Sequence, residues 1–118
     1  MNKEIKFEDM VRALAKPGVE IKEQLTSNDA HILHMAVGIS GESGELLDAI
    51  KKAVIYRKAL DRENVVEELG DLEFYMEGLR QGTGITREEC IAANVLKLGV
   101  RYGHRYSDQA AHDRKDKQ

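Results

Sequence analysis

Two pairs of acidic residues, each at helical spacing, constrain the fold of this chain most. Glu42 and Glu45 form the first pair, and Glu68 and Asp71 form the second. Residues three apart lie on one face of an α-helix, so each pair points two carboxylates the same way. Residues 46–67 leave room for one helix to end and for a second to return alongside it. Four facing carboxylates repel unless a cation lies between them, so the spacing predicts a magnesium-type site between two antiparallel helices.

The length and the composition fit one helical domain spanning residues 1–118. Charged residues make up 33% and hydrophobic residues 42% of the chain, a mixture typical of a soluble helical protein. The net charge of −3 gives no basic footprint for duplex nucleic acid. The single cysteine excludes an internal disulfide, and we find neither a membrane-spanning apolar run nor a secretion signal. We therefore expect a cytoplasmic protein without membrane contact.

Hydrophobic periodicity and capping signals predict an all-α, antiparallel four-helix-bundle-like fold. A short amphipathic helix follows Phe7 and stops at Pro17-Gly18, and residues 19–27 are expected to form a connector. Long helices are expected over about 28–56 and 62–80. A capping box of Thr86 and Glu89 opens a helix that runs to about residue 102. The core spans about 28–103, and the polar tail 104–118 is either a flexible end or a strap that orders over a site.

Glycines accompany the first acidic pair. Gly38, Gly41 and Gly44 lie on or beside the acidic stripe of the same expected helix. Each costs a helix about 1 kcal/mol relative to alanine. This cost predicts that another group approaches the backbone closely. The alternative is a solvated acidic face with incidental glycines.

Basic and amide side chains form a further stripe near the end of the last expected helix. Asn94, Lys97 and Arg101 share this stripe, and the two cations are placed to meet phosphates beside the metal site. The alternative is that basic groups in the last turn only complement the helix dipole.

The acidic pairs and their surroundings resemble the MazG-like nucleotide pyrophosphohydrolases of the all-α NTP pyrophosphatase superfamily. The hallmark of this family is Glu-x-x-Glu, a spacer and Glu-x-x-Asp, which stands here as Glu42, Glu45, Glu68 and Asp71. The flanking runs also fit, and they read Gly-Glu-Ser-Gly-Glu-Leu-Leu-Asp-Ala-Ile-Lys-Lys, Val-Glu-Glu-Leu-Gly-Asp-Leu-Glu-Phe-Tyr and Asn-Val-Leu-Lys-Leu-Gly-Val-Arg-Tyr. The resemblance covers about residues 30–103, and the tail resembles that of short, phage-type members.

The resemblance implies Mg²⁺-dependent hydrolysis of a nucleoside triphosphate to a monophosphate and pyrophosphate, with Mn²⁺ as a substitute metal. It implies that the four acids are catalytic metal ligands and that the phosphate chain is bound by Asn94, Lys97, Arg101 and Tyr102. It also implies a homodimer or homotetramer and, for a phage-encoded member, the host cytoplasm. One position departs from the pattern: many relatives have an acid where this chain has Gly41. Where that acid activates water, this chain needs a substitute, either one of the four acids or a hydroxide on the metal.

Two other functions stay open from sequence. The first is hydrolysis of phosphoribosyl-ATP, whose own local patterns we do not find in this chain. The second is a non-catalytic helical protein that binds a partner, which predicts neither metal dependence nor nucleotide turnover. The base and sugar preference, the biological role and the oligomer size are not fixed by the sequence.

Overall fold

Helices account for the regular secondary structure throughout the described part of the chain, which confirms the all-α prediction. The computed structural model describes residues 4–103 and 105–117. The elements in chain order are α1 (Phe7–Leu14), α2 (Gly18–Gln24), α3 (Ser27–Val54), α4 (Arg62–Thr83), α5 (Arg87–Tyr102), α6 (Asp108–Asp113) and the short 3-10 helix η1 (Lys115–Lys117). None of the described helices is long and apolar enough to cross a membrane.

Side-chain caps fix where the three long helices begin. The backbone N–H of Asn64 donates to Asp61 at the start of α4, over 3.1 Å. The predicted capping box at the start of α5 is confirmed, because Thr86 and Glu89 exchange reciprocal bonds of 3.0 and 3.1 Å. A similar reciprocal pair opens α3. These bonds satisfy N–H groups that a helix start leaves without a partner.

The predicted connector at residues 19–27 is wrong over most of its length, because Gly18–Gln24 forms α2. Pro17 is the N-cap of this helix. A proline cannot continue the preceding helix, but its fixed φ suits the start of the next one. Pro17 therefore ends one helix, as the sequence predicts, and also begins the next one, which the sequence analysis does not predict.

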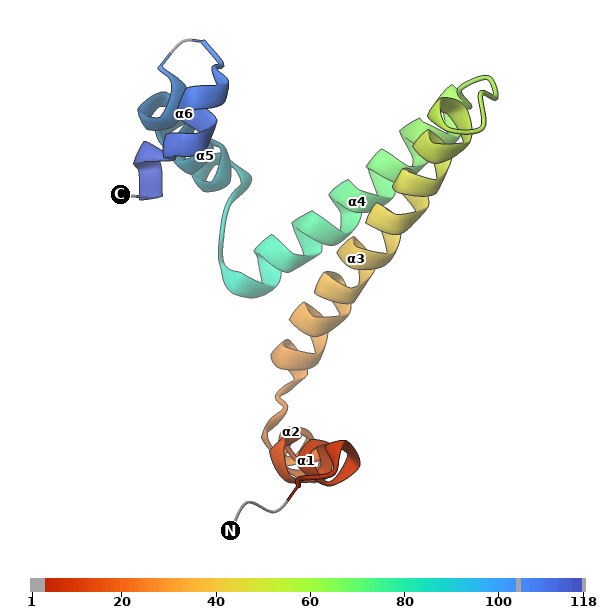
Figure 1. Ribbon diagram of the computed structural model, residues 1–118, viewed down its shortest axis with the longest axis vertical. Coiled ribbons are helices and arrows are strands. Elements are labelled where there is room, and N and C mark those ends of the chain that lie inside the picture. Colours follow the sequence, from red (N-terminus) through yellow and green to blue (C-terminus); the bar gives the residue numbers. More distant parts are fainter. Residues whose placement is uncertain (1–3, 104, 118) are drawn as a thin grey trace.

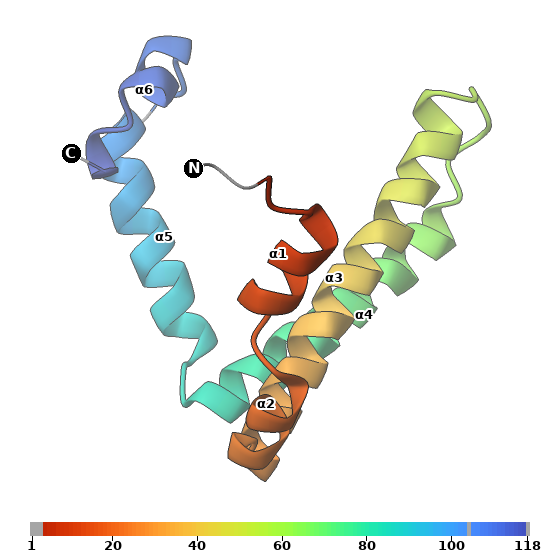
Figure 2. The same cartoon turned by 60° about the horizontal axis from the view of Figure 1, so that its bottom comes forward.

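The long helices α3 and α4 lie side by side and antiparallel along most of their lengths (Figures 1 and 2). Two glycines allow this close approach. A Cβ atom at Gly38 would overlap the ring of Tyr75, and one at Gly78 would overlap the sulfur of Met35. Met35 is one of the few apolar side chains that the described chain buries. The close approach predicted from the glycines is therefore confirmed at Gly38, whereas a Cβ at Gly41 or Gly44 would meet nothing within 4 Å.

The remaining helices extend away from the α3–α4 pair. Both views show α5 and α6 apart from it at one end of α4, and Figure 1 shows α1 and α2 beyond the start of α3. The radius of gyration is 20.7 Å, whereas a compact domain of this length has about 13.5 Å. Many large apolar side chains are more than half exposed, and those on α3, α4 and α5 include Leu33, Val37, Leu47, Phe74, Val95 and Leu96.

The C-terminal segment folds back on α5 through α6 and η1. Ser107 caps α6, and Arg101 of α5 forms an ion pair with Asp116 of η1. The tail therefore packs against α5, and its placement over a site stays a prediction. The first and last residues of the expected tail, His104 and Gln118, lie outside the described residues.

Candidate metal centre and phosphate-binding helix

Three of the four acids meet between α3 and α4. One carboxylate oxygen from each of Glu42, Glu68 and Asp71 lies within 4.8 Å of the other two. Glu42 comes from α3, and the other two come from successive turns of one face of α4. The antiparallel pairing therefore brings together residues that are far apart in the sequence, as their spacing predicted. We refer to these three residues as the acidic trio.

The acidic trio is partly buried. Glu68 is only 9% exposed and is the one polar residue that the described chain buries. One oxygen of Glu42 and one of Glu68, the Oε2 atom in each, are shielded from solvent and have no hydrogen-bond partner. Buried carboxylate oxygens without a partner are costly, because they lose hydration without compensation.

Glu45 lies beside the trio but does not belong to it. It contributes to the electrostatics of Glu68, whose pKa is raised from 4.5 to about 7. The main cause is the hydrogen-bonding contact with Glu42, followed by burial and then by the contact and charge of Glu45. Neighbouring negative charges disfavour a further ionised carboxylate, so Glu68 holds its proton near neutrality.

The donor set of this centre fits a hard divalent cation. Mg²⁺ and Ca²⁺ take oxygen ligands, and carboxylates supply them here from two helices. The two unpartnered oxygens would gain a partner, and the repulsion that raises the pKa of Glu68 would be relieved. The centre can therefore hold a divalent metal ion.

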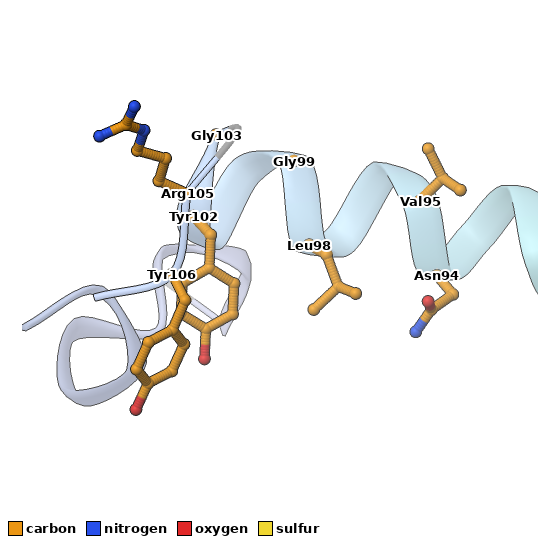
Figure 3. A pocket seen from close by; sticks show the side chains of 8 residues that line it. All are labelled: Asn94, Val95, Leu98, Gly99, Tyr102, Gly103, Arg105 and Tyr106. Atoms are coloured by element: carbon orange, nitrogen blue, oxygen red, sulfur yellow. The ribbon is translucent and has the colours of Figure 1, made fainter. Parts of the chain in front are cut away.

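The predicted phosphate-binding residues all lie on α5, which does not bring them to the acidic trio within one chain (Figures 1 and 2). Asn94 and Tyr102 line a pocket of about 590 Å³ along this helix. Their side chains and that of Leu98 point to the same side of α5 (Figure 3). Tyr106 faces Tyr102, with 5.3 Å between the ring centroids.

Lys97 and Arg101 have different surroundings. Lys97 is exposed, whereas the Arg101 side chain is only 15% exposed and donates two hydrogen bonds to Asp116, of 2.8 and 3.1 Å. Sequence reasoning missed Asp116. Its neighbours Lys115 and Lys117 are charged as well, and no periodicity in this segment distinguishes Asp116 from a fully solvated aspartate.

Comparison with known protein families agrees with this geometry. The family model described as MazG nucleotide pyrophosphohydrolase domain matches residues 30–106. The chain belongs to the MazG family. A search of curated proteins and a search of solved structures each gave no match.

The MazG match places the acidic trio, Glu45 and the whole of α5 in one family domain. It confirms the resemblance drawn from the two acidic pairs. The family is one of nucleotide pyrophosphohydrolases, which is a coarser statement than any particular substrate or metal. Within this MazG domain, Gly41 is exposed, and no carboxylate stands at its position.

Proposed function

We propose that this MazG protein is an Mg²⁺-dependent pyrophosphohydrolase that cleaves a nucleoside or deoxynucleoside triphosphate to its monophosphate and pyrophosphate. The observation that carries the proposal is the acidic trio, whose oxygens converge within 4.8 Å and include two buried atoms without a partner. A cluster of this kind is unfavourable by itself and favourable around a cation. Mn²⁺ is the expected substitute metal.

Glu42, Glu68 and Asp71 would hold the metal, and Glu45 lies beside Glu68. When bound, Mg²⁺ supplies charge neutralisation on the phosphates and activation of the attacking water. Glu68 would release its proton as the metal binds, since a nearby cation favours the charged carboxylate. Because Gly41 offers no acid, we assign acceptance of the water proton to Glu45, which is exposed and lies outside the trio.

We further propose that a second copy of the chain covers the exposed helices and that the assembly is a homodimer or homotetramer. The accessible surface is 10073 Å², whereas a compact monomer of 13.3 kDa has about 6,500 Å². The excess of about 3,600 Å² per chain amounts to about 7,200 Å² for two copies, which is at least as large as the total area that obligate interfaces bury. In such an assembly Asn94, Lys97, Arg101 and Tyr102 of one copy are proposed to face the phosphate chain held at the acids of the other.

The experiment is a Mg²⁺ titration with each common NTP and dNTP that measures pyrophosphate separately from orthophosphate. Glu45→Gln and Asp71→Asn should each lower pyrophosphate release at least about a hundredfold while the helical circular dichroism is retained. Glu67→Gln removes an exposed acid from the same helix as Asp71 and should leave the rate within about twofold.

Undiminished release by either site variant would refute the site assignment. Cleavage of phosphoribosyl-ATP with no turnover of NTPs or dNTPs would replace the proposed substrate class. Absence of metal-dependent turnover with every nucleotide would instead favour the non-catalytic helical protein.

A further inference from the structure

The 3-10 helix η1 lines one side of a pocket on α5 that is distinct from the acidic trio. This pocket has a volume of about 360 Å³. Lys97, Leu96 and Val100 of α5 contribute to one side of it, and Lys115, Asp116 and Lys117 of η1 contribute to the other. We call it the C-terminal pocket. The three lysines come from segments 18 to 20 positions apart along the chain, so the pocket exists only while η1 is seated on α5.

An ion pair between Arg101 and Asp116 holds η1 against α5. Nε of Arg101 donates to Oδ1 of Asp116 over 2.8 Å, and Nη2 donates to Oδ2 over 3.1 Å. The two side chains are 15% and 5% exposed, so this pair is far better shielded than the surface ion pairs elsewhere on the chain. A bidentate guanidinium–carboxylate pair fixes orientation as well as distance. Arg101 therefore determines where Lys115 and Lys117 lie.

The ion pair also decides the charge of the pocket. Asp116 is the one acid among the lining residues, and Arg101 neutralises it. Lys97, Lys115 and Lys117 then leave the pocket with three uncompensated positive charges from its lining. Leu96 and Val100 are the large apolar residues in the lining of the same pocket. Three ammonium groups around one pocket favour a compact, multiply charged anion.

We propose that the C-terminal pocket is an anion subsite for the phosphate chain of the substrate, in which Lys97, Lys115 and Lys117 contact phosphoryl oxygens and Arg101 and Asp116 are positioning residues. This inference rests on the proposed function for the identity of the anion as a polyphosphate. Arg101 uses two of its five N–H donors on Asp116, so holding the turn leaves it donors for a phosphate.

The test measures binding of inorganic pyrophosphate to the full chain by calorimetry in the presence of a metal chelator. Without metal the acidic trio repels the anion, so binding reports on cationic groups. Lys115→Gln/Lys117→Gln leaves the Arg101–Asp116 pair intact and should weaken binding about tenfold. The control Lys16→Gln/Lys22→Gln makes the same change in net charge on exposed residues near α1 and α2 and should alter binding less than twofold.

Asp116→Asn separates positioning from local charge. It makes the surroundings of the pocket more positive, so a purely electrostatic effect of Asp116 would tighten pyrophosphate binding. If Asp116 instead acts by holding η1 against α5, its replacement should weaken pyrophosphate binding about as much as Lys115→Gln/Lys117→Gln does. In turnover assays both variants should raise KM for the metal–nucleotide complex with little change in kcat.

Tighter binding by Asp116→Asn, or unchanged binding by Lys115→Gln/Lys117→Gln, would overturn the subsite. Either result beside normal pyrophosphate release by the unmodified protein would leave the proposed function standing. The expected losses of binding, together with no turnover of any nucleotide, would sustain the subsite and reject the proposed hydrolase.

Discussion

The pKa of Glu68 is raised by the neighbouring residues that would share a metal ion with it. Its pKa of about 7 lies above the ordinary value of 4.5, because Glu42 contacts it, the helices bury it and Glu45 adds negative charge. The folded protein therefore binds a proton at this carboxylate that the unfolded chain has already released between these pH values. The contribution of Glu68 to stability is complete below pH 4.5 and is lost as the pH rises through about 7.

This sign gives a prediction for the metal-free protein. In a chelator, the melting temperature should be lower at about pH 8 than at about pH 5.5, and Mg²⁺ should raise it more at the higher pH. The measurement is a set of thermal melts by circular dichroism over this pH range, with and without Mg²⁺.

Glu68→Gln provides the control for that series. It removes the titrating group and should flatten the dependence of the metal-free melting temperature on pH. A magnesium shift of the same size at both pH values in the unmodified protein would contradict the assigned role of Glu68.

At the residue scale, helical spacing was sufficient to predict which acids share a face. It predicted Glu42, Glu45, Glu68 and Asp71 as one cluster, and the structure brings all but Glu45 together. Helical spacing does not predict how deeply a side chain is buried. The burial of Glu68 and the position of Glu45 outside the acidic trio follow from the packing of α3 against α4. Asp116 was missed for a related reason, because its partner Arg101 lies in another helix.

The α3–α4 pair depends on close backbone approach at particular turns. Gly38 admits the ring of Tyr75, which also lies edge-on to His34 with 6.2 Å between centroids. Where α3 begins and α4 ends, the side chain of Asn28 donates to the carbonyl of Gly82 over 2.9 Å. Small residues and cross-helix hydrogen bonds therefore set the separation at which the acidic trio meets.

Two alanine substitutions in the same helix should have opposite effects. Gly38→Ala places a methyl group against Tyr75 and should lower the free energy of unfolding by about 1–3 kcal/mol. Gly44→Ala meets no atom within 4 Å and should raise it by about 1 kcal/mol through helix propensity. Urea unfolding followed by circular dichroism measures both. Stabilisation by Gly38→Ala would show that the close approach to Tyr75 does not constrain the pair.

At the element scale, local chemistry predicted boundaries where a cap or a turn glycine marked them. The capping box of Thr86 and Glu89 is an example, and so is Asp61 at the start of α4. The prediction failed at α2, which has no side-chain cap and follows a proline that equally well ends a helix. The seating of η1 on α5 depends on a contact between segments and had no local signal.

The whole chain exposes more surface than a compact monomer of its mass. Few apolar side chains are buried in the described residues, and α5 lies apart from the helices that hold the acids (Figures 1 and 2). The sequence indicated amphipathic helices but not which surface each one covers, because periodicity marks an apolar face without naming what packs against it. We therefore expect the proposed second copy to cover the apolar surfaces that the extended single chain exposes.

The prediction at this scale is an oligomer that single charges disrupt. Light scattering after size-exclusion chromatography should give a mass of at least twice 13.3 kDa. Leu47→Asp and Phe74→Asp, each 68% exposed in the single chain, should shift the protein toward the monomer, because each places a carboxylate where an apolar contact is expected. Lys58→Asp, in the exposed turn between α3 and α4, is the matched control and should not change the mass. A monomeric mass for the unmodified protein would refute the second copy.

The separation of α5 from the acids has a consequence for how this protein would behave as a catalyst. If one copy supplies the metal site and another supplies the phosphate-binding helix, the rate of nucleotide cleavage will not be proportional to the protein concentration. At low abundance, doubling the protein would more than double the rate, and a cell would have a threshold below which nucleotide cleavage is almost silent. The amount of the protein that the cell synthesises would then control the activity, without a separate effector molecule.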